Sequence, residues 1–168
     1  MEDVNFLTNV TLFIELEPQE IDQLHKSFHT TRFAPGDIIL QEGQANRALH
    51  IVRSGRIRVS RRIGEGEVAL TDLVAGQTFG ELSIIEDGVA SATLEAVADT
   101  EISSIGMNDL ATFLRDKPAA AAKFWRQMAV DLRRRLVQTN DVVRSQFEVN
   151  RALAENPAFR QVYAMCNR

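Results

Sequence analysis

Apolar and polar residues alternate over residues 33–60, in short runs broken by glycine turns such as Pro35-Gly36 and Gly43. A period of two is typical of strands with one buried face, and glycine between such runs is typical of tight turns. The same reasoning indicates a hairpin over residues 60–68 and a last strand over residues 98–107. This part of the chain therefore predicts short strands joined by glycine turns.

Helical spacing replaces the alternation on both sides of this region. Residues 4–28 place apolar side chains at helical intervals, and Glu17-Pro18 resembles the start of a helix that runs to the end of that range. Asn108 or Asp109 is the expected cap of a further helix. One long amphipathic helix is predicted from Pro118 to about Phe147. Its apolar stripe consists of Phe124, Met128, Leu132, Leu136, Val143 and Phe147.

The composition is that of an ordinary globular protein, with 45% apolar and 25% charged residues among 168. Its one cysteine, Cys166, rules out a disulfide framework or a cysteine cluster for a metal. No apolar run approaches the roughly 20 residues that cross a bilayer, and no signal peptide is evident. We therefore expect a cytoplasmic protein without a membrane partner.

Charge divides the chain into two parts. Residues 1–114 carry 8 basic and 18 acidic side chains, whereas residues 115–168 carry 11 basic and 5 acidic ones. The change coincides with the expected change from strands to helices. We therefore predict N-terminal helices plus a β-domain over 1–114 and a C-terminal helical region over 115–168.

Candidate chemistry is concentrated in residues 79–96, FGELSIIEDGVASATLEA. A helical turn that starts at Gly80 would leave the amides of Glu81, Leu82 and Ser83 directed at a ligand. Such a turn is a candidate anion cup. Acidic turn residues and a strand of small residues come after it.

FGEL followed by such a strand resembles the phosphate-binding cassette of cyclic-nucleotide-binding domains. The resemblance extends over about residues 12–145 and includes the family's leading pattern of turn glycines and strand residues. It implies an antiparallel β-roll, a jelly-roll-like barrel of about eight strands with flanking helices. It also implies cyclic AMP or cyclic GMP as ligand, with Glu81 on the ribose hydroxyl. The leading pattern falls on Gly36, Asp37, Ile38, Gly43, Leu49, Ile51, Gly55, Ile57 and Val59.

The family's phosphate-binding arginine has no counterpart here, because Ala90 occupies its position, followed by Ser91. From Ile63 to Leu114 there is no Lys, Arg or His, while ten carboxylates fall in the same window. An arginine from elsewhere is the alternative source of charge. This arginine could be Arg126 or Arg134 on the long helix, or an arginine of the opposite subunit. It could also be Arg56, Arg58 or Arg62, if one of these side chains turned inward.

The long helix resembles the dimerisation helix of catabolite-activator-type regulators. That resemblance implies a homodimer and places Thr139 and Asn140 at positions that touch the adenine base, although both also suit an exposed polar face. Arg133 to Arg135 is most simply a solvated face. The segment after the long helix is too short for a helix-turn-helix, so we do not expect sequence-specific DNA binding by this chain alone.

Enzyme chemistry has little support in this sequence. His25 and His29 lie one helical turn apart without an evident third ligand, and His50 is alone on a predicted strand. Ser83 and Ser91 lack a partner base at motif spacing. We therefore predict a non-enzymatic regulatory module in signal transduction, with an altered pocket, that acts through a ligand or a protein partner. The alternative is a genuine cyclic-nucleotide sensor with its arginine supplied from elsewhere.

Overall fold

The computed structural model describes residues 6–64, 66–81, 88–155 and 165, which fall into two compact units, residues 1–127 and 128–168. The described part of the first unit contains η1, α2, eight strands, the helix α4 and the beginning of α5. The elements are η1 (Thr11–Phe13), α2 (Pro18–His25), β1 (Phe28–Phe33), β2 (Ile38–Leu40), β3 (Ala48–Ser54), β4 (Arg56–Ile63), β5 (Gly66–Val74), β6 (Thr78–Phe79), β7 (Thr93–Ala96), β8 (Thr100–Gly106), α4 (Met107–Asp116) and α5 (Pro118–Glu155).

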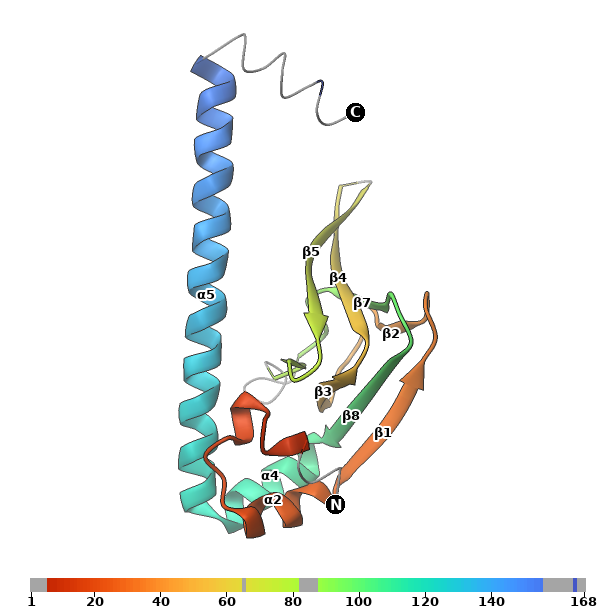
Figure 1. Cartoon of the computed structure of the whole chain (residues 1–168), viewed down its shortest axis with the longest axis vertical. Helices are drawn as coiled ribbons and strands as arrows, with labels where there is room; N and C mark the ends of the chain where they lie inside the picture. Colours follow the sequence, from red (N-terminus) through yellow and green to blue (C-terminus); the bar gives the residue numbers. More distant parts are fainter. Residues whose placement is uncertain (1–5, 65, 82–87, 156–164, 166–168) are drawn as a thin grey trace. The chain divides into compact units, whose positions relative to one another are not determined.

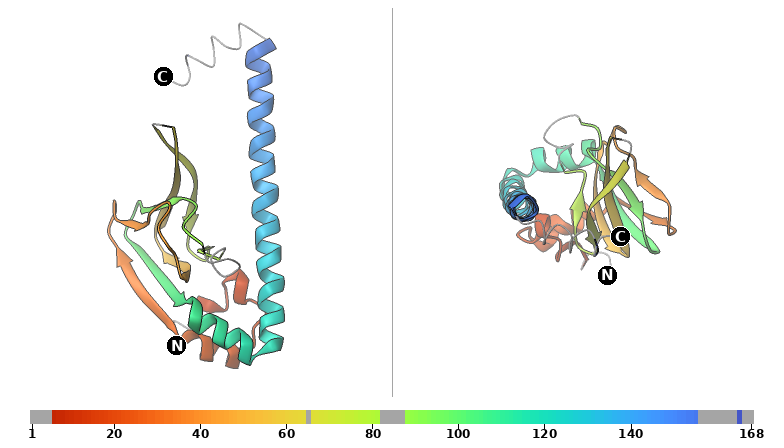
Figure 2. Two further views of the ribbon diagram at one scale, coloured as in Figure 1. Left: turned by 180° about the vertical axis from the view of Figure 1, so that it is seen from behind. Right: turned by 90° about the horizontal axis from the view of Figure 1, so that it is seen from above.

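The strands form two four-stranded antiparallel sheets, with the orders β1-β8-β3-β6 and β2-β7-β4-β5. Neighbours in each sheet come from distant parts of the chain, apart from the β4–β5 hairpin (Figure 1). Figure 2 shows the two sheets facing each other as layers of one roll. The predicted fold class, mainly β with flanking helices, is confirmed.

An apolar core fills the space between the sheets. Period-two alternation explains its make-up, since each strand contributes every second side chain. Its buried members are Leu40, Val52, Ile57, Leu73, Phe79, Ala90, Leu94 and Ile102. Between these positions Arg56 and Arg58 of β4 are exposed, as the alternation predicted.

A second apolar layer joins the N-terminal helices to residues 118–127, the first part of α5, which we call its root. The ring of Phe13 stacks on Phe124 at 5.9 Å between centroids and meets Phe28 edge to face at 6.1 Å. The helices α2 and α4 lie together at one end of the β1-β8-β3 sheet (Figure 1). These contacts fix the first ten residues of α5 within the first unit.

Two local predictions differ from the structure. The helix α2 ends at His25, and Phe28 instead begins β1, because its backbone pairs with Ile105 of β8. The residue that caps α4 is Gly106, without a side-chain hydrogen bond, so the expected cap at Asn108 or Asp109 is wrong. Both errors arise because sheet pairing sets the ends of neighbouring helices.

The remainder of α5 belongs to the second unit, and the predicted long helix is confirmed, eight residues longer than expected at its end. Most of its apolar side chains after Leu132 are exposed, including Leu136, Val143 and Phe147. Among the described helices, none combines the length and the apolar character required to span a membrane.

Candidate functional site

Gly80 and Glu81 come directly after β6, at the start of the predicted cassette. Gly80 has φ +79°, a conformation that side chains rarely adopt. A β-carbon there would lie 2.4 Å from Asn46 Nδ2 and 2.6 Å from the Ala48 carbonyl oxygen. Glycine is therefore required both by the backbone angle and by the lack of space. The carboxylate of Glu81 comes directly after this turn and is buried, with 6% of the residue exposed.

Asn46 organises the polar surroundings of Gly80. Its Nδ2 donates to the Ala48 carbonyl at 2.9 Å, and its Oδ1 accepts from the Ala48 amide at 3.3 Å. The same Oδ1 lies 3.0 Å from His50 Nε2. Because a carbonyl oxygen only accepts, Nε2 of His50 carries the hydrogen in this network.

His50 lies on the inner face of the roll, since it is two residues before the core residue Val52 on β3. Its Nδ1 accepts from the Ser104 hydroxyl at 2.7 Å, and its ring stacks on Phe79 at 4.7 Å between centroids. Burial lowers the pKa of His50 to about 4. The ring is therefore neutral at physiological pH and supplies hydrogen bonds rather than charge.

Ala90, at the family's arginine position, is a buried member of the core between the sheets. Its amide donates to the Gln44 carbonyl at 2.8 Å, and its carbonyl accepts from the Gly43 amide at 2.8 Å. Ser91 is exposed. The other candidates in the cassette, Leu82 and Ser83, lie outside the described residues.

The arginines considered as substitutes are exposed, and several have carboxylate partners. Arg126 donates to Glu15, with 3.1 Å between Nε and Oε2. Arg56 lies 4.0 Å from Asp72. In the second unit, Arg134 and Arg135 both pair with Asp131, at 3.4 and 2.8 Å. The side chains of Arg58 and Arg62 are also exposed.

Among the described residues, the buried charged side chains are carboxylates. In the part of the chain that the structure describes, the buried charged side chains are Glu81 in the first unit and Asp131 in the second. No described lysine or arginine is buried. The interior of the first unit therefore holds one carboxylate and no buried cation among these residues.

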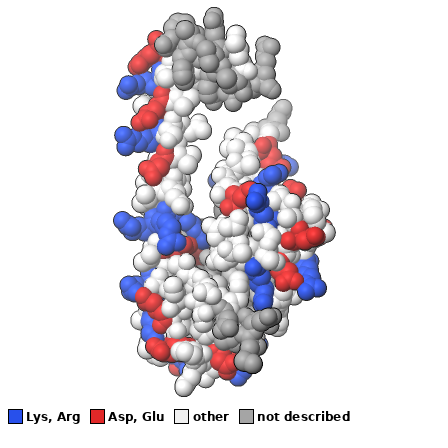
Figure 3. All heavy atoms as spheres, in the orientation of Figure 1, with Lys and Arg blue, Asp and Glu red and all other residues white. Residues whose placement is uncertain are grey.

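Thr139 and Asn140 belong to the second unit, where both side chains are exposed. The hydroxyl of Thr139 donates to the Arg135 carbonyl one helical turn earlier, at 2.9 Å. Charged side chains gather along one side of α5 (Figure 3), in part as helical pairs such as Arg144 with Glu148. The sides of this helix therefore differ in character.

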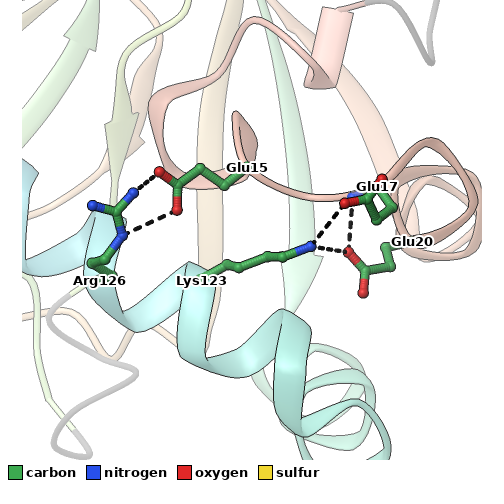
Figure 4. A network of polar contacts seen from close by, with 5 residues as sticks. All are labelled: Glu15, Glu17, Glu20, Lys123 and Arg126. Atoms are coloured by element: carbon green, nitrogen blue, oxygen red, sulfur yellow. Dashed lines mark hydrogen bonds and ion pairs between the residues drawn. The ribbon is translucent and has the colours of Figure 1, made fainter.

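A network of ion pairs holds the N-terminal segment on the root of α5 (Figure 4). Lys123 donates to Glu17 at 3.2 Å and to Glu20 at 3.4 Å, and Arg126 pairs with Glu15. Burial alone lowers the pKa of Lys123, but the hydrogen bonds and charges of Glu17 and Glu20 reverse the effect and raise it. We call these five residues the clasp.

Sequence reasoning identified part of the clasp, the helix start at Glu17-Pro18. In the structure Glu20 closes a capping box, with its carboxylate accepting from the Glu17 amide at 2.8 Å. The partners on α5 are more than 100 positions away, and no local pattern indicates them.

In the described residues, no group of three or more His, Cys, Asp or Glu side chains is placed to hold a metal ion.

Two facing sheets, with a buried carboxylate directly after a glycine turn of positive φ, define a β-roll with a candidate binding site. Comparison with known proteins agrees with this class: the model of the cyclic nucleotide-binding domain matches residues 30–117. The chain belongs to the cyclic nucleotide-binding domain family. More particularly, it is similar to the N-terminal part of regulators of the catabolite-activator type, and this region is a regulatory domain of that family.

The relatives define this similarity. The chain is 34% identical to the cyclic AMP receptor protein of Thermus thermophilus over 111 residues, 66% of this chain and 51% of that protein. It is 29% identical to a CRP-like cAMP-activated global transcriptional regulator of Mycobacterium tuberculosis over 129 residues, 76% of this chain and 58% of the relative. The chain thus spans somewhat over half the length of these relatives. The crystal structure of the Thermus thermophilus catabolite activator protein has a TM-score of 0.70 and 31% identity, over 84% of this chain and 65% of that one.

Proposed function

We propose that this regulatory domain has lost the phosphate-binding arginine of its family and works with an altered pocket. It acts without chemistry of its own, through a ligand other than a tightly bound cyclic nucleotide or through a protein partner. The observation that carries this proposal is Ala90, which stands at the position of the family's arginine and is buried in the apolar core between the sheets.

The energetic consequence supports the proposal. A hydrogen bond to a charged group contributes about 1.5–3 kcal/mol, so the loss of one such bond weakens binding about ten- to hundredfold. Ala90 cannot supply this bond, because its side chain is a methyl group and is buried in the apolar core. Ordinary cyclic-nucleotide affinity is therefore not expected.

The ligand-facing residues of this domain are a proposal as well. The set is Gly80, Glu81, Leu82, Ser83, Ala90, Ser91, Thr139 and Asn140. Glu81 is its central member, because its burial after the Gly80 turn is the feature that the described residues support best. The division of the chain at residues 114 and 115, and the cytoplasmic location, stay predictions.

We further propose that a second copy of this chain is the partner of α5, since exposed Leu136, Val143 and Phe147 continue its apolar stripe. DNA binding by this chain alone is not part of the proposal. Between α4 and Glu155 the described chain forms one continuous helix, α5, whereas a helix-turn-helix needs two helices across a turn.

A genuine cyclic-nucleotide sensor is the second candidate. The observation in its favour is the name of the Thermus relative, a cyclic AMP receptor protein. In that case an arginine from outside the cassette neutralises the phosphate. Arg126 and Arg134 on α5 are two of the candidates named above, and each would have to leave its carboxylate partner first.

Calorimetric titration with cyclic AMP and cyclic GMP separates the two candidates. The altered pocket predicts no heat of binding below millimolar ligand, and the sensor predicts micromolar binding that Glu81→Ala abolishes. Ala90→Arg is the matched gain-of-function variant, expected to increase cyclic AMP affinity at least about tenfold. Micromolar binding by the unmodified protein would contradict the altered pocket.

A further inference from the structure

Asn150 lies on the exposed apolar stripe of α5. An α-helix turns by about 100° per residue, so Val143 and Phe147 point within about 20° of the direction of Leu136. By the same geometry Asn150 points about 40° from that direction, one turn beyond Phe147. All four side chains are exposed. The stripe that the proposed homodimer covers therefore contains a polar amide.

Charged side chains do not specify how two copies of this helix align. Arg144 pairs with Glu148 at 3.2 Å and Arg151 pairs with Glu155 at 3.5 Å, each within one helix. Charged side chains gather along one side of α5 (Figure 3), and helical geometry directs these four about 60–120° away from Leu136. Each pair forms within its own copy and needs no partner chain. The register of a dimer is therefore left to the side chains of the stripe itself.

An amide in the stripe distinguishes one register from another. Apolar side chains pack against each other in several registers, whereas a buried amide that lacks a hydrogen-bond partner weakens association about tenfold or more. In two parallel copies in register, Asn150 meets Asn150 of the partner subunit, and each amide can donate to the oxygen of the other. A slip of one or two turns would place Phe147 or Val143 there instead and leave both amides without a hydrogen bond.

An antiparallel pair does not satisfy this amide. Asn140 is the other asparagine near the stripe, about 40° from Leu136 in the opposite sense to Asn150. Two antiparallel helices bring the same edge of each stripe together, so Asn140 and Asn150, which lie on opposite edges, would not meet. The parallel arrangement in register is the one that pairs Asn150.

We propose that Asn150 sets the register of the α5 homodimer, by hydrogen bonding to Asn150 of the partner subunit between two parallel helices. The inference rests on the homodimer proposed above and names the residue that determines its alignment. It is carried by the position of the amide among the exposed side chains of Val143 and Phe147, and by charged pairs that each form within one helix. The paired amides favour one alignment at a cost in affinity.

Oxidative cross-linking of single-cysteine variants tests the alignment. With Cys166→Ser as background, Leu136→Cys and Val143→Cys are introduced separately. In a parallel dimer in register both positions lie against their own copies, and we expect both variants to form disulfide-linked dimers. An antiparallel dimer can bring at most one position onto itself. Arg144→Cys, on the charged side, is the control and should stay unlinked. Linkage of only one stripe position, or of neither while sedimentation still shows a dimer, would overturn the inference.

Asn150→Val tests the role of the amide itself. Because this change replaces a buried polar group by an apolar one, we expect dimerisation to become at least about tenfold tighter and the unique alignment to be lost. The loss is measured as species larger than a dimer in sedimentation, or as a lower yield of the Leu136→Cys cross-link. Ser145→Val, on the side of α5 opposite Leu136, is the matched control and should change neither.

These measurements separate failure of the register from failure of the homodimer. A chain that is monomeric at micromolar concentration would overturn the homodimer, and this inference with it. A dimer whose affinity and cross-links are the same with Asn150→Val as without it would overturn the role of Asn150 alone and leave the homodimer in place.

Discussion

Gly80 is a single residue on which the geometry near Glu81 depends. Its φ of +79° and its contacts with Asn46 and Ala48 exclude a side chain, so the turn holds only with glycine. The sequence suggested an anion cup at Gly80 from the helical turn expected to start there. It carried no indication that Asn46 lies against this turn, because the contact joins residues 34 positions apart.

Gly80→Ala should therefore destabilise the fold by about 3 kcal/mol, because left-handed strain and the clash with Asn46 Nδ2 add together. The matched control is Gly76→Ala, at φ +86° but with nothing within 4 Å of the new carbon. In that variant only the backbone strain of an alanine at positive φ lowers the free energy of unfolding, by about 1 kcal/mol. Urea unfolding measures both, and equal losses would show that the close approach at Gly80 costs nothing.

His50 makes stability depend on pH. Its pKa is lowered to about 4 in the fold against 6.5 in the unfolded chain, so the unfolded state takes up a proton first as the pH falls. The contribution of His50 to the free energy of unfolding is complete above pH 6.5. It is lost as the pH falls towards about 4, and the loss is at most about 3 kcal/mol.

The measurement is the difference in unfolding free energy between the unmodified protein and His50→Gln, followed from pH 8 to about pH 4. Carboxylates titrate in both proteins and cancel in this difference. We expect the advantage of the unmodified protein to shrink steadily below about pH 6.5. A difference that does not change with pH would mean that His50 titrates alike in both states.

At the scale of elements, the turn glycines were the most reliable prediction. Gly36, Gly43 and Gly55, expected between strands from the alternation pattern, have φ of 91°, 81° and 90°. The short strand β6 was not expected, because two residues carry no periodicity. Strand pairing with β3 creates it, through His50 opposite Phe79.

The clasp connects two elements that the sequence keeps far apart, α2 and the root of α5. Glu20 is its most enclosed carboxylate, with 15% of the side chain exposed, and it accepts from both the Glu17 amide and Lys123. Glu20→Ala should lower the free energy of unfolding by about 1.5 kcal/mol, since it removes a capping-box partner and an ion pair together.

Asp22→Ala on the same helix is the control for this prediction. Asp22 is 60% exposed and forms an ion pair with the exposed Lys26, so its removal should change stability by less than about 0.5 kcal/mol. Thermal or urea unfolding of both variants provides the comparison. Indistinguishable losses would show that the clasp contributes no more than an ordinary surface pair.

At the scale of the whole molecule, the exposed apolar stripe of α5 argues for association. Phe147 is 71% exposed and Val143 is 61% exposed, a poor arrangement for a helix in water. Charged pairs such as Arg144 with Glu148 occupy another side of the same helix. A partner that covers the stripe would leave these pairs in solvent.

Sedimentation velocity at micromolar concentration should accordingly show a dimer. Val143→Asp should shift it to monomer, since a charge in an apolar helix seam weakens association by about a hundredfold or more. Arg144→Ala, one residue away on the charged side, should remain dimeric. Monomeric behaviour of the unmodified chain would contradict the proposed homodimer.

The sequence by itself determined most of the strands, though not β6, and also the turn glycines, the long helix and the lack of any basic residue from 64 to 113. These depend on periodicity and side-chain chemistry, which are properties of neighbouring residues. The tertiary structure decided which polar groups meet: Asn46 and Ser104 at His50, and Lys123 at the capping box. It also decided that Glu81 is buried, because burial and pairing across many residues depend on sheet register and packing.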